Sequence, residues 1–385
     1  MNRTDSKIKF VGLHAHSVAG SIFDAIGYPQ AHMDFCYKNG GDALALTDHG
    51  NMNGLAYQVL HAKKMQEEGK EFKPIFGCEA YFIPSVEEWR EEYTRAMEDK
   101  KLARSAKKDE QSGATVEDEG ASKKTQDVLR KRNHLVLLVQ NQTGLNNLFK
   151  LVSESYQSEN FYRYPRIDYR LLKKYNEGII AASACLGGVY AGDYWENRDE
   201  GPEAVLAAMR NTTERMVDVF GDRWYAEIQW NNIEEQHQLN QFVIQTAQEM
   251  GVALITTADS HYPNPDAWKD RELYKRLGWL GKGRPSWAEE ESQLPAGVEE
   301  IGYELYPKNG DQMWESYKQY SEEQGFEYDD DLILKSIEET HRIAHDRIET
   351  FLPDNTVRLP EFVVPAGFTA AQALVNYALE GLKDR

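Results

Sequence analysis

Short runs rich in apolar and β-branched residues recur along the chain, and turn residues or longer segments of helical character separate them. Runs of this length and composition are typical of buried strands. Seven strands are predicted on this basis, at residues 8–13, 43–47, 74–82, 134–139, 178–182, 224–229 and 252–257.

Most of these runs are followed by a segment that favours a helix, at residues 29–38, 54–68, 142–156 and 235–250. Strands that alternate with helices indicate parallel β-α-β units, because parallel neighbours need a crossover connection. Seven such units favour an α/β barrel, in which functional groups gather at the carboxyl ends of the strands.

One segment departs from this pattern. Residues 87–132 are crowded with charged and polar side chains, and residues 107–125 hold almost nothing apolar. Such a composition is typical of a solvated, partly disordered insertion. Its flanks, 86–102 and 127–132, are predicted as helices, and we assign it no chemistry.

The composition of the sequence changes after about residue 265. Residues 276–312 are rich in Gly, Pro and Trp without a clear period, and residues 329–348 favour a helix. Two prolines then indicate an extended linker at 359–365, which precedes a last helix at 368–382. We therefore expect a domain at residues 1–275 and a connector at 276–385. The end of the chain suggests a fragment or one half of a split protein.

Composition narrows the possible functions. With 44 basic and 63 acidic residues the formal charge is −19, which argues against a generally basic surface for wrapping DNA. A local site in which metal ions supply the positive charge stays open. The polar N-terminus and the lack of a long apolar run predict a cytoplasmic protein without a membrane partner. Three cysteines do not suggest a disulfide framework.

Side chains that can bind metal ions cluster near the ends of the predicted strands, and they include five of the ten histidines of the chain. Each has a plain alternative: Cys78 and Cys185 could be small buried residues, Asp48 could shape a turn, and Glu79 could pair with an arginine. Their joint placement favours a metal site. The residues concerned are His14, His16, Asp24, Asp48, His49, Cys78, Glu79, His134, Cys185, Asp259 and His261, with Glu227 one position short of a similar place.

The mixture of imidazole, carboxylate and thiol ligands suits Zn²⁺ or Mn²⁺, with Fe²⁺ or Mg²⁺ as alternatives. One tetrahedral ion cannot use so many ligands, so two or three ions are predicted, with Glu79 as a natural bridge. Clustered divalent ions suit the hydrolysis of phosphoesters, because they activate water and neutralise the phosphate.

Several motifs resemble the polymerase and histidinol phosphatase (PHP) domain, in the version at the N-terminus of bacterial DNA polymerase III alpha subunits. They are LHAHS at 13–17, LTDHGNM at 46–52, IFGCE at 75–79, NHLVLLVQN at 133–141, SACLGG at 183–188 and TTADSHY at 256–262. The resemblance covers residues 8–265 strongly. It continues weakly through 359–362 and 380–383, which are similar to the segment that leads toward the polymerase palm.

This resemblance implies a distorted (β/α)7 barrel with a trinuclear metal site and, in active members, a 3′–5′ exonuclease. The implied metal ligands are His14, His16, Asp24, His49, Glu79, His134, Cys185, Asp259 and His261, and the implied catalytic residues are His14, His16, His49, Glu79, Asp259 and His261. The spacing between Ser17 and Ser21 is one residue longer than usual before Asp24. The insertion at 87–132 is also unusually long, and the acidic pair of the palm is not in the sequence.

Three functions follow as hypotheses. The first is an exonuclease that removes nucleotides from the single-stranded 3′ end of a DNA primer. The second is a small-molecule phosphatase similar to histidinol phosphatase, and the third is a non-catalytic, metal-stabilised scaffold that docks a proofreading exonuclease. The remainder of a polymerase chain, the exonuclease subunit and a sliding clamp are the expected protein partners.

Other conspicuous residues are predicted to have structural roles. We expect surface or packing positions for His32, His61, His237, His341 and His345, and a packing role for Tyr262. Arg163 and Arg166 lie in an aromatic run and could contact a nucleic-acid strand, although a structured loop is an equal alternative.

Overall fold

The computed structural model describes residues 3–109, 128, 131–280, 304–353, 356 and 362–383. The chain divides into two compact units, Met1–Phe351 and Leu352–Arg385. The second unit contains α14 (Ala370–Lys383), which confirms the predicted last helix. Residues 359–361 of the predicted linker lie outside the described residues, and the expected boundary near residue 275 falls inside a described helix, α10 (Trp268–Leu280). Both expectations stay predictions. No helix among the described residues is long and apolar enough to cross a membrane.

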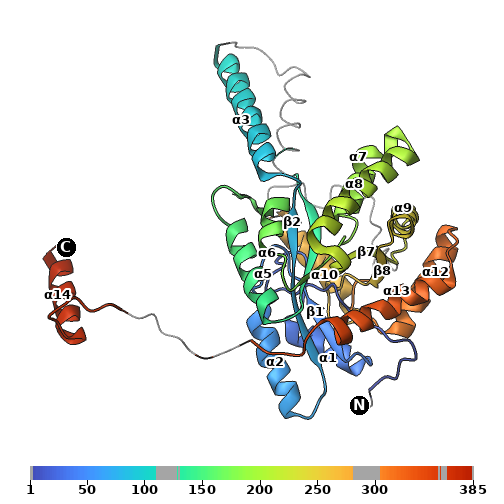
Figure 1. Ribbon diagram of the computed structural model, residues 1–385, viewed down its shortest axis with the longest axis horizontal. Coiled ribbons are helices and arrows are strands. Elements are labelled where there is room, and N and C mark those ends of the chain that lie inside the picture. Colours follow the sequence, from blue (N-terminus) through green and yellow to red (C-terminus); the bar gives the residue numbers. More distant parts are fainter. Residues whose placement is uncertain are drawn as a thin grey trace. The chain divides into compact units, whose positions relative to one another are not determined.

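The first unit is built on a curled sheet (Figure 1). The strand order is β4 (Phe161–Tyr162), β5 (Tyr164–Ile167), β2 (Lys73–Phe82), β3 (Asn133–Val139), β6 (Ile179–Ala182), β7 (Trp224–Gln229) and β8 (Ala253–Thr257), with β1 (Ala43–Leu46) also paired to β2. Six of the seven predicted strands are therefore present, and the α/β barrel-like class is confirmed.

The first predicted strand, residues 8–13, forms no regular ladder, but its neighbourhood connects the two sides of the sheet. Gly12 bridges to Leu44, and Ala15 bridges to Ser260 just after β8. A Cβ atom at Gly12 would lie only 2.9 Å from the Leu44 side chain, so glycine permits this close approach. The N-terminal segment therefore lies between β1 and the end of β8.

The expectation of uniformly parallel strands is wrong at β3. This strand runs antiparallel to both β2 and β6, whereas the β1–β2, β6–β7 and β7–β8 pairs are parallel. The register pairs Phe82 with Asn133, so the chain returns at the end of the sheet where β2 finishes and needs no crossover. As a consequence, His134 lies at the start of its strand and still faces the same rim as the strand ends.

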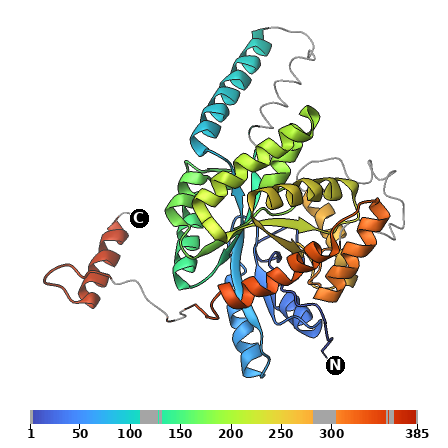
Figure 2. The ribbon, with the colours of Figure 1, turned by 45° about the vertical axis from the view of Figure 1, so that its right-hand side comes forward.

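Helices surround the sheet (Figure 2). The four helices predicted after strands are present as α1 (Pro29–Lys38), α2 (Leu55–Glu67), α5 (Gln142–Ser155) and α9 (Glu234–Met250). Further helices are α6 (Tyr169–Tyr175), α7 (Val189–Asn197), α8 (Pro202–Phe220), α10 (Trp268–Leu280) and α12 (Gly310–Gln324). The helix predicted at 329–348 is α13 (Asp330–Arg342), which continues into a π-helical turn, η4 (Ile343–Arg347).

The charged insertion begins with a helix, α3 (Val86–Asp109), which extends beyond the predicted flank and projects from the sheet (Figures 1 and 2). Its first turns are anchored by the buried side chains of Val86 and Trp89, which pack against Ile83. Almost all of the centre that we predicted to be disordered, residues 107–125, lies outside the described residues.

The core of the barrel is filled by small and branched side chains from the strands and the N-terminal segment, including Val11, Ala45 and Ile180. Ile343, Ala344 and Ile348, from η4 and its end, belong to the same buried cluster. Burying each such isoleucine side chain contributes roughly 1.5–3 kcal/mol. The segment after α13 therefore closes one end of the barrel, which we call the base, and leaves the opposite rim for polar residues.

Candidate metal centre

The nine predicted ligands come together at the rim opposite the base, which we call the ligand rim. They come from the N-terminal segment, the loops after β1, β6 and β8, the later part of β2 and the start of β3. His14 and His16 occupy alternate positions beside the Ala15 bridge, so both side chains point to the same side. The sequence therefore identified residues that the fold does assemble.

Glu79 lies at the middle of the cluster and is fully buried. Its Oε1 is 3.2 Å from His14 Nε2 and 3.0 Å from His134 Nδ1. Its Oε2 is 2.5 Å from His49 Nδ1 and 3.6 Å from His16 Nε2. One carboxylate thus faces four imidazoles from three other segments, as a bridging ligand would.

Asp259 supplies a second shared carboxylate. Its Oδ1 lies 3.2 Å from His14 Nε2, 3.1 Å from His16 Nε2 and 3.5 Å from His261 Nδ1. The backbone of Asp259 has a φ of 48°, in the left-handed region that residues other than glycine rarely adopt. Strain of this kind is typical of functional sites, where the surrounding structure holds the residue in place.

Asp24 and Cys185 complete the cluster from its two sides. Asp24 Oδ2 is 2.9 Å from His49 Nε2 and 3.3 Å from His261 Nε2, and its Oδ1 pairs with Arg271 at 2.7 Å. The unusual spacing before Asp24 therefore does not remove it from the site. Cys185 Sγ lies 3.6 Å from His134 Nδ1.

The donor atoms fit metal ions better than they fit one another. Five buried atoms have no hydrogen-bond partner among the described residues, although they lie close together: His14 Nε2, His16 Nε2, His49 Nδ1, Glu79 Oε2 and Asp259 Oδ1. Ligand atoms about 2.0–2.2 Å from one tetrahedral ion are separated by roughly 3.3–3.6 Å, close to most distances seen here. Three triads each offer ligand atoms within 4.8 Å of one another: His16, His49 and His261; His14, His16 and Asp259; His49, Glu79 and His134.

The carboxylates at the centre are held in their charged form. Burial raises the pKa of Glu79, but His134, His49 and His14 outweigh burial and bring it well below its usual value. Burial likewise raises the pKa of Asp259, and His14 and His261 reverse that effect. The site therefore holds these carboxylates in the ionised form that binds divalent cations.

The imidazoles and the thiol respond differently to the same surroundings. Burial lowers the pKa of His49, yet Glu79 and Asp24 raise it to about 10. The pKa of His16 falls well below its usual value because of burial and the neighbouring His49 and His261. Burial, Asp259 and Glu79 raise the pKa of the Cys185 thiol. A metal ion would displace protons from His49 and Cys185, because both must be deprotonated to bind it.

A buried carboxylate behind His14 orients that ligand. Glu227 Oε1 lies 2.8 Å from His14 Nδ1, and it also accepts hydrogen bonds from Thr257 Oγ1 at 2.5 Å and Gln229 Nε2 at 3.1 Å. With the proton on Nδ1, the Nε2 atom of His14 is free to bind metal. From the sequence, Glu227 was placed one position short of the ligand positions. Its inward position in β7 could have identified it as a partner of a ligand.

Asp48 is structural, as one alternative predicted. It accepts hydrogen bonds from the Ser17 amide at 2.7 Å, from Ser17 Oγ at 3.0 Å and from Ser21 Oγ at 2.9 Å. Ser21 Oγ in turn lies 3.2 Å from His16 Nδ1. Asp48 thus stabilises the loop that carries His16.

An aromatic and cationic surface lies beside the ligands, and the sequence did not reveal it. The Tyr81 ring centroid is 6.2 Å from that of His49 and 5.6 Å from that of His134. The Arg132 guanidinium lies 3.9 Å from the centroid of Tyr164 and 5.4 Å from that of Tyr81. Tyr81, Arg132 and Tyr164 are each only partly buried, so they offer stacking surfaces next to the metal centre.

The suggestion that Arg166 contacts phosphate is wrong. Arg166 is fully buried and donates hydrogen bonds to the carbonyl oxygens of Lys131, Tyr162 and Tyr164. It therefore organises the loop, whereas Arg163 is exposed. Tyr262 is buried as predicted.

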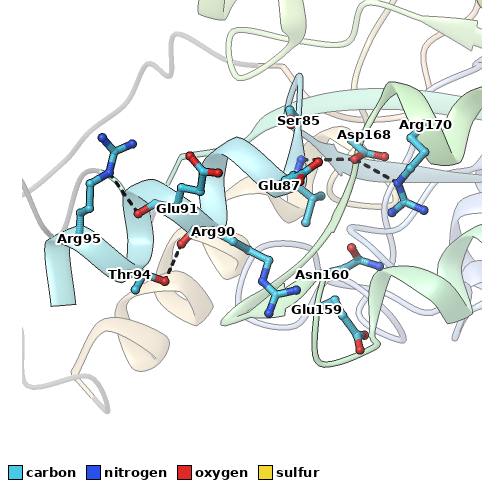
Figure 3. Close-up of a pocket in the computed structure, with 11 residues that line it drawn as sticks. Ser85, Glu87, Arg90, Glu91, Thr94, Arg95, Glu159, Asn160, Asp168 and Arg170 are labelled. Carbon is cyan, nitrogen blue, oxygen red and sulfur yellow. Dashed lines mark hydrogen bonds and ion pairs between the residues drawn. The ribbon is translucent and has the colours of Figure 1, made fainter. Parts of the chain in front are cut away.

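A cavity of about 950 Å³ lies away from the ligands, between the start of α3 and the segment before α6 (Figure 3). Arginines and carboxylates both line it, among them Arg90, Glu91 and Arg170. Asp168, at its wall, accepts hydrogen bonds from the amides of Leu171 and Val86 and so fixes α6 and α3. The cavity marks the docking of α3, and the candidate site remains the ligand rim.

Comparisons with known proteins find sequence matches over most of the chain. The PHP domain model matches residues 12–231. The DNA polymerase III alpha subunits of Aquifex aeolicus and Borreliella burgdorferi are 31% and 30% identical, each over 98% of this chain but only 28% and 27% of their own lengths. The chain thus spans about a quarter of these relatives. Among solved structures, an amidohydrolase from Chromobacterium violaceum aligns over 69% of this chain and 96% of its own, at 15% identity and a TM-score of 0.33.

Proposed function

The chain belongs to the PHP domain family, and on that premise we propose that it is a metal-dependent phosphodiesterase that removes nucleotides from the 3′ end of single-stranded DNA. The observation that carries the proposal is the convergence of nine predicted ligand side chains from six segments on one cluster, with Glu79 fully buried at its middle. The pKa of Glu79 lies well below its usual value, and three ring nitrogens, His14 Nε2, His16 Nε2 and His49 Nδ1, lack a hydrogen-bond partner among the described residues.

Two or three divalent ions, zinc or manganese, would be held by the nine ligands. When bound, such ions supply an activated water and positive charge for the phosphate oxygens. Glu79 and Asp259 are placed to be shared between ions, because each faces several imidazoles. Glu227 keeps the Nε2 atom of His14 directed into the site.

The surroundings favour a nucleic-acid strand over a small phosphate ester. Tyr81 and Tyr164 offer aromatic faces beside the ligands, and Arg132 lies over both rings. Stacking of bases on such residues contributes about 1–3 kcal/mol per base and tolerates any sequence. The similarity to DNA polymerase III alpha subunits supports DNA as the strand. A polymerase palm, a proofreading exonuclease and a sliding clamp are proposed partners on the same ground.

The test uses the purified chain with Mn²⁺ or Zn²⁺ and a single DNA strand labelled at its 3′ end. We expect labelled mononucleotides at the earliest times, and a stepwise ladder when the label is at the 5′ end. The double variant His14→Ala, His49→Ala should be inactive. His61→Ala is the matched control, because His61 of α2 pairs with Asp34 of α1, at 2.9 Å, and is not one of the nine candidate ligands.

The same experiment separates the alternatives. Nuclease activity that persists in the double variant would remove the assignment of the site. Turnover of a phosphomonoester without any effect on DNA would favour the small-molecule phosphatase. Bound metal without turnover of either substrate would favour the metal-stabilised scaffold.

A further inference from the structure

A second group of metal-binding side chains lies at the base of the barrel. Asp42 immediately precedes β1, His341 lies in the last turn of α13, and His345 lies in η4. His345 Nε2 is 3.3 Å from Asp42 Oδ1, and His341 Nε2 is 3.7 Å from Asp42 Oδ2. The two imidazole centroids are 4.3 Å apart.

This group is separate from the ligand rim. Asp42 and His49 stand at opposite ends of β1, and seven residues of extended chain span about 20 Å. None of the three residues belongs to the nine ligands at the rim. An ion bound here would therefore be independent of the proposed nuclease chemistry.

We propose that Asp42, His341 and His345 form an additional site for a zinc-class divalent ion, with water completing the coordination. Histidines at i and i+4 on a helix point to the same side, so both imidazoles can reach one ion. Ligand atoms about 2.0–2.2 Å from a tetrahedral ion are roughly 3.3–3.6 Å apart, close to the two distances observed. The side chains of Asp42, His341 and His345 are 39%, 27% and 32% exposed, respectively, so an ion can enter from solvent.

The position of the site gives it a structural consequence. It joins the first residues of the barrel wall to η4, about 300 positions later in the chain. Lys73 already holds the same turn by donating hydrogen bonds to the carbonyl oxygens of Ala344 and Ile348, at 2.6 and 2.5 Å. An ion that binds only the folded chain stabilises it, so zinc bound here would stabilise the contact between η4 and the start of β1.

The first experiment counts ions in the full chain. The chain is stripped with EDTA, loaded with Zn²⁺ alone, separated from free metal and subjected to elemental analysis. His345→Ala should hold one zinc ion fewer than the parent and keep full nuclease activity. His61→Ala, which breaks an isolated histidine–aspartate pair, should keep the parental count. Equal counts in His345→Ala and the parent would overturn the site.

A second experiment separates this site from the rim and guards against misfolding. In the His14→Ala, His49→Ala background, adding His345→Ala should remove a further ion, whatever the outcome of the nuclease assay. Zinc at about a hundredfold excess over Kd should raise the Tm of that background by roughly 5 °C more than that of the triple variant. Identical zinc-dependent shifts, with equal Tm values before zinc is added, would overturn the proposal.

Discussion

At the ligand rim, five buried imidazole and carboxylate atoms lie close together without a hydrogen-bond partner among the described residues, whereas at the base the buried ammonium group of Lys73 donates to two carbonyl oxygens. Both ends of the same barrel therefore bury polar groups, but the protein satisfies Lys73 at the base and leaves those five atoms at the rim without a partner. The apolar side chains of Ile343 and Ile348 seal the base, and the rim has charged carboxylates in their place.

This difference separates a functional site from a structural one. Native proteins satisfy almost all their buried polar groups, because an unmade hydrogen bond costs about 1–3 kcal/mol. A concentration of unsatisfied atoms at one rim indicates that something outside the chain completes it. We expect changes at the rim to act on metal binding and activity, and changes at the base to act on stability.

The largest effect is expected at Glu79. Glu79→Gln removes the charge that faces four imidazoles, so the chain should lose bound metal and more than about 100-fold of its nuclease activity, since even outer partners of a metal site are worth 10–100-fold. Elemental analysis and the single-strand assay measure both. Glu68→Gln, on the surface, is the control. Retention of metal and activity would show that Glu79 does not hold the ions.

A smaller effect at the same rim is expected from Glu227. Glu227→Gln keeps the shape of the side chain but removes the charge that orients His14, so metal affinity should fall roughly 10–100-fold. Competition with a chromogenic chelator measures the affinity. An unchanged affinity would mean that His14 does not depend on this carboxylate for its orientation.

A change at the base should lower the stability of the fold and leave the activity unchanged. Lys73→Met leaves the carbonyl oxygens of Ala344 and Ile348 without their donor, and the free energy of unfolding should fall by about 2 kcal/mol. Urea titration measures the loss, and Lys64→Met, at an exposed position, is the control. Metal content at the rim and nuclease activity should not change. A loss of activity in the folded variant would contradict the separation of the two ends.

The smallest effect concerns Asp193, a buried carboxylate in α7 without the histidines that surround Glu79. Burial raises its pKa to about 7. Because the folded pKa lies above the unfolded value near 3.9, the folded chain retains the proton longer, and stability declines as the pH rises from about 4 through 7. Asp193→Asn should therefore raise the free energy of unfolding by about 1–2 kcal/mol at pH 8, and by nothing near pH 4.

Urea titrations of the Asp193 variant and the parent at both pH values provide the measurement. Asp199→Asn is the control, because the Asp199 side chain is almost fully exposed. A gain of equal size at both pH values would show that ionisation of Asp193 is not its cause.

Much of the fold and of the candidate site follows from local patterns in the sequence. Six of seven predicted strands and the helices at residues 29–38, 54–68, 142–156 and 235–250 are present, because apolar periodicity and turn residues act over short distances. The candidate ligands His14, His49 and Asp259 were identifiable for a related reason. They stand at or just beyond the ends of predicted strands, and the ends of barrel strands meet at one rim.

By itself, then, the sequence determined the strands, the helices and the residue types available for chemistry. Only the tertiary structure decided that β3 runs antiparallel, that Glu227 lies behind His14, that Arg166 is buried, and that Asp42 meets His341 and His345. Each of these depends on how elements far apart in the chain pack against one another. The spacing of residues along one segment does not determine which side chain lies opposite them across the barrel.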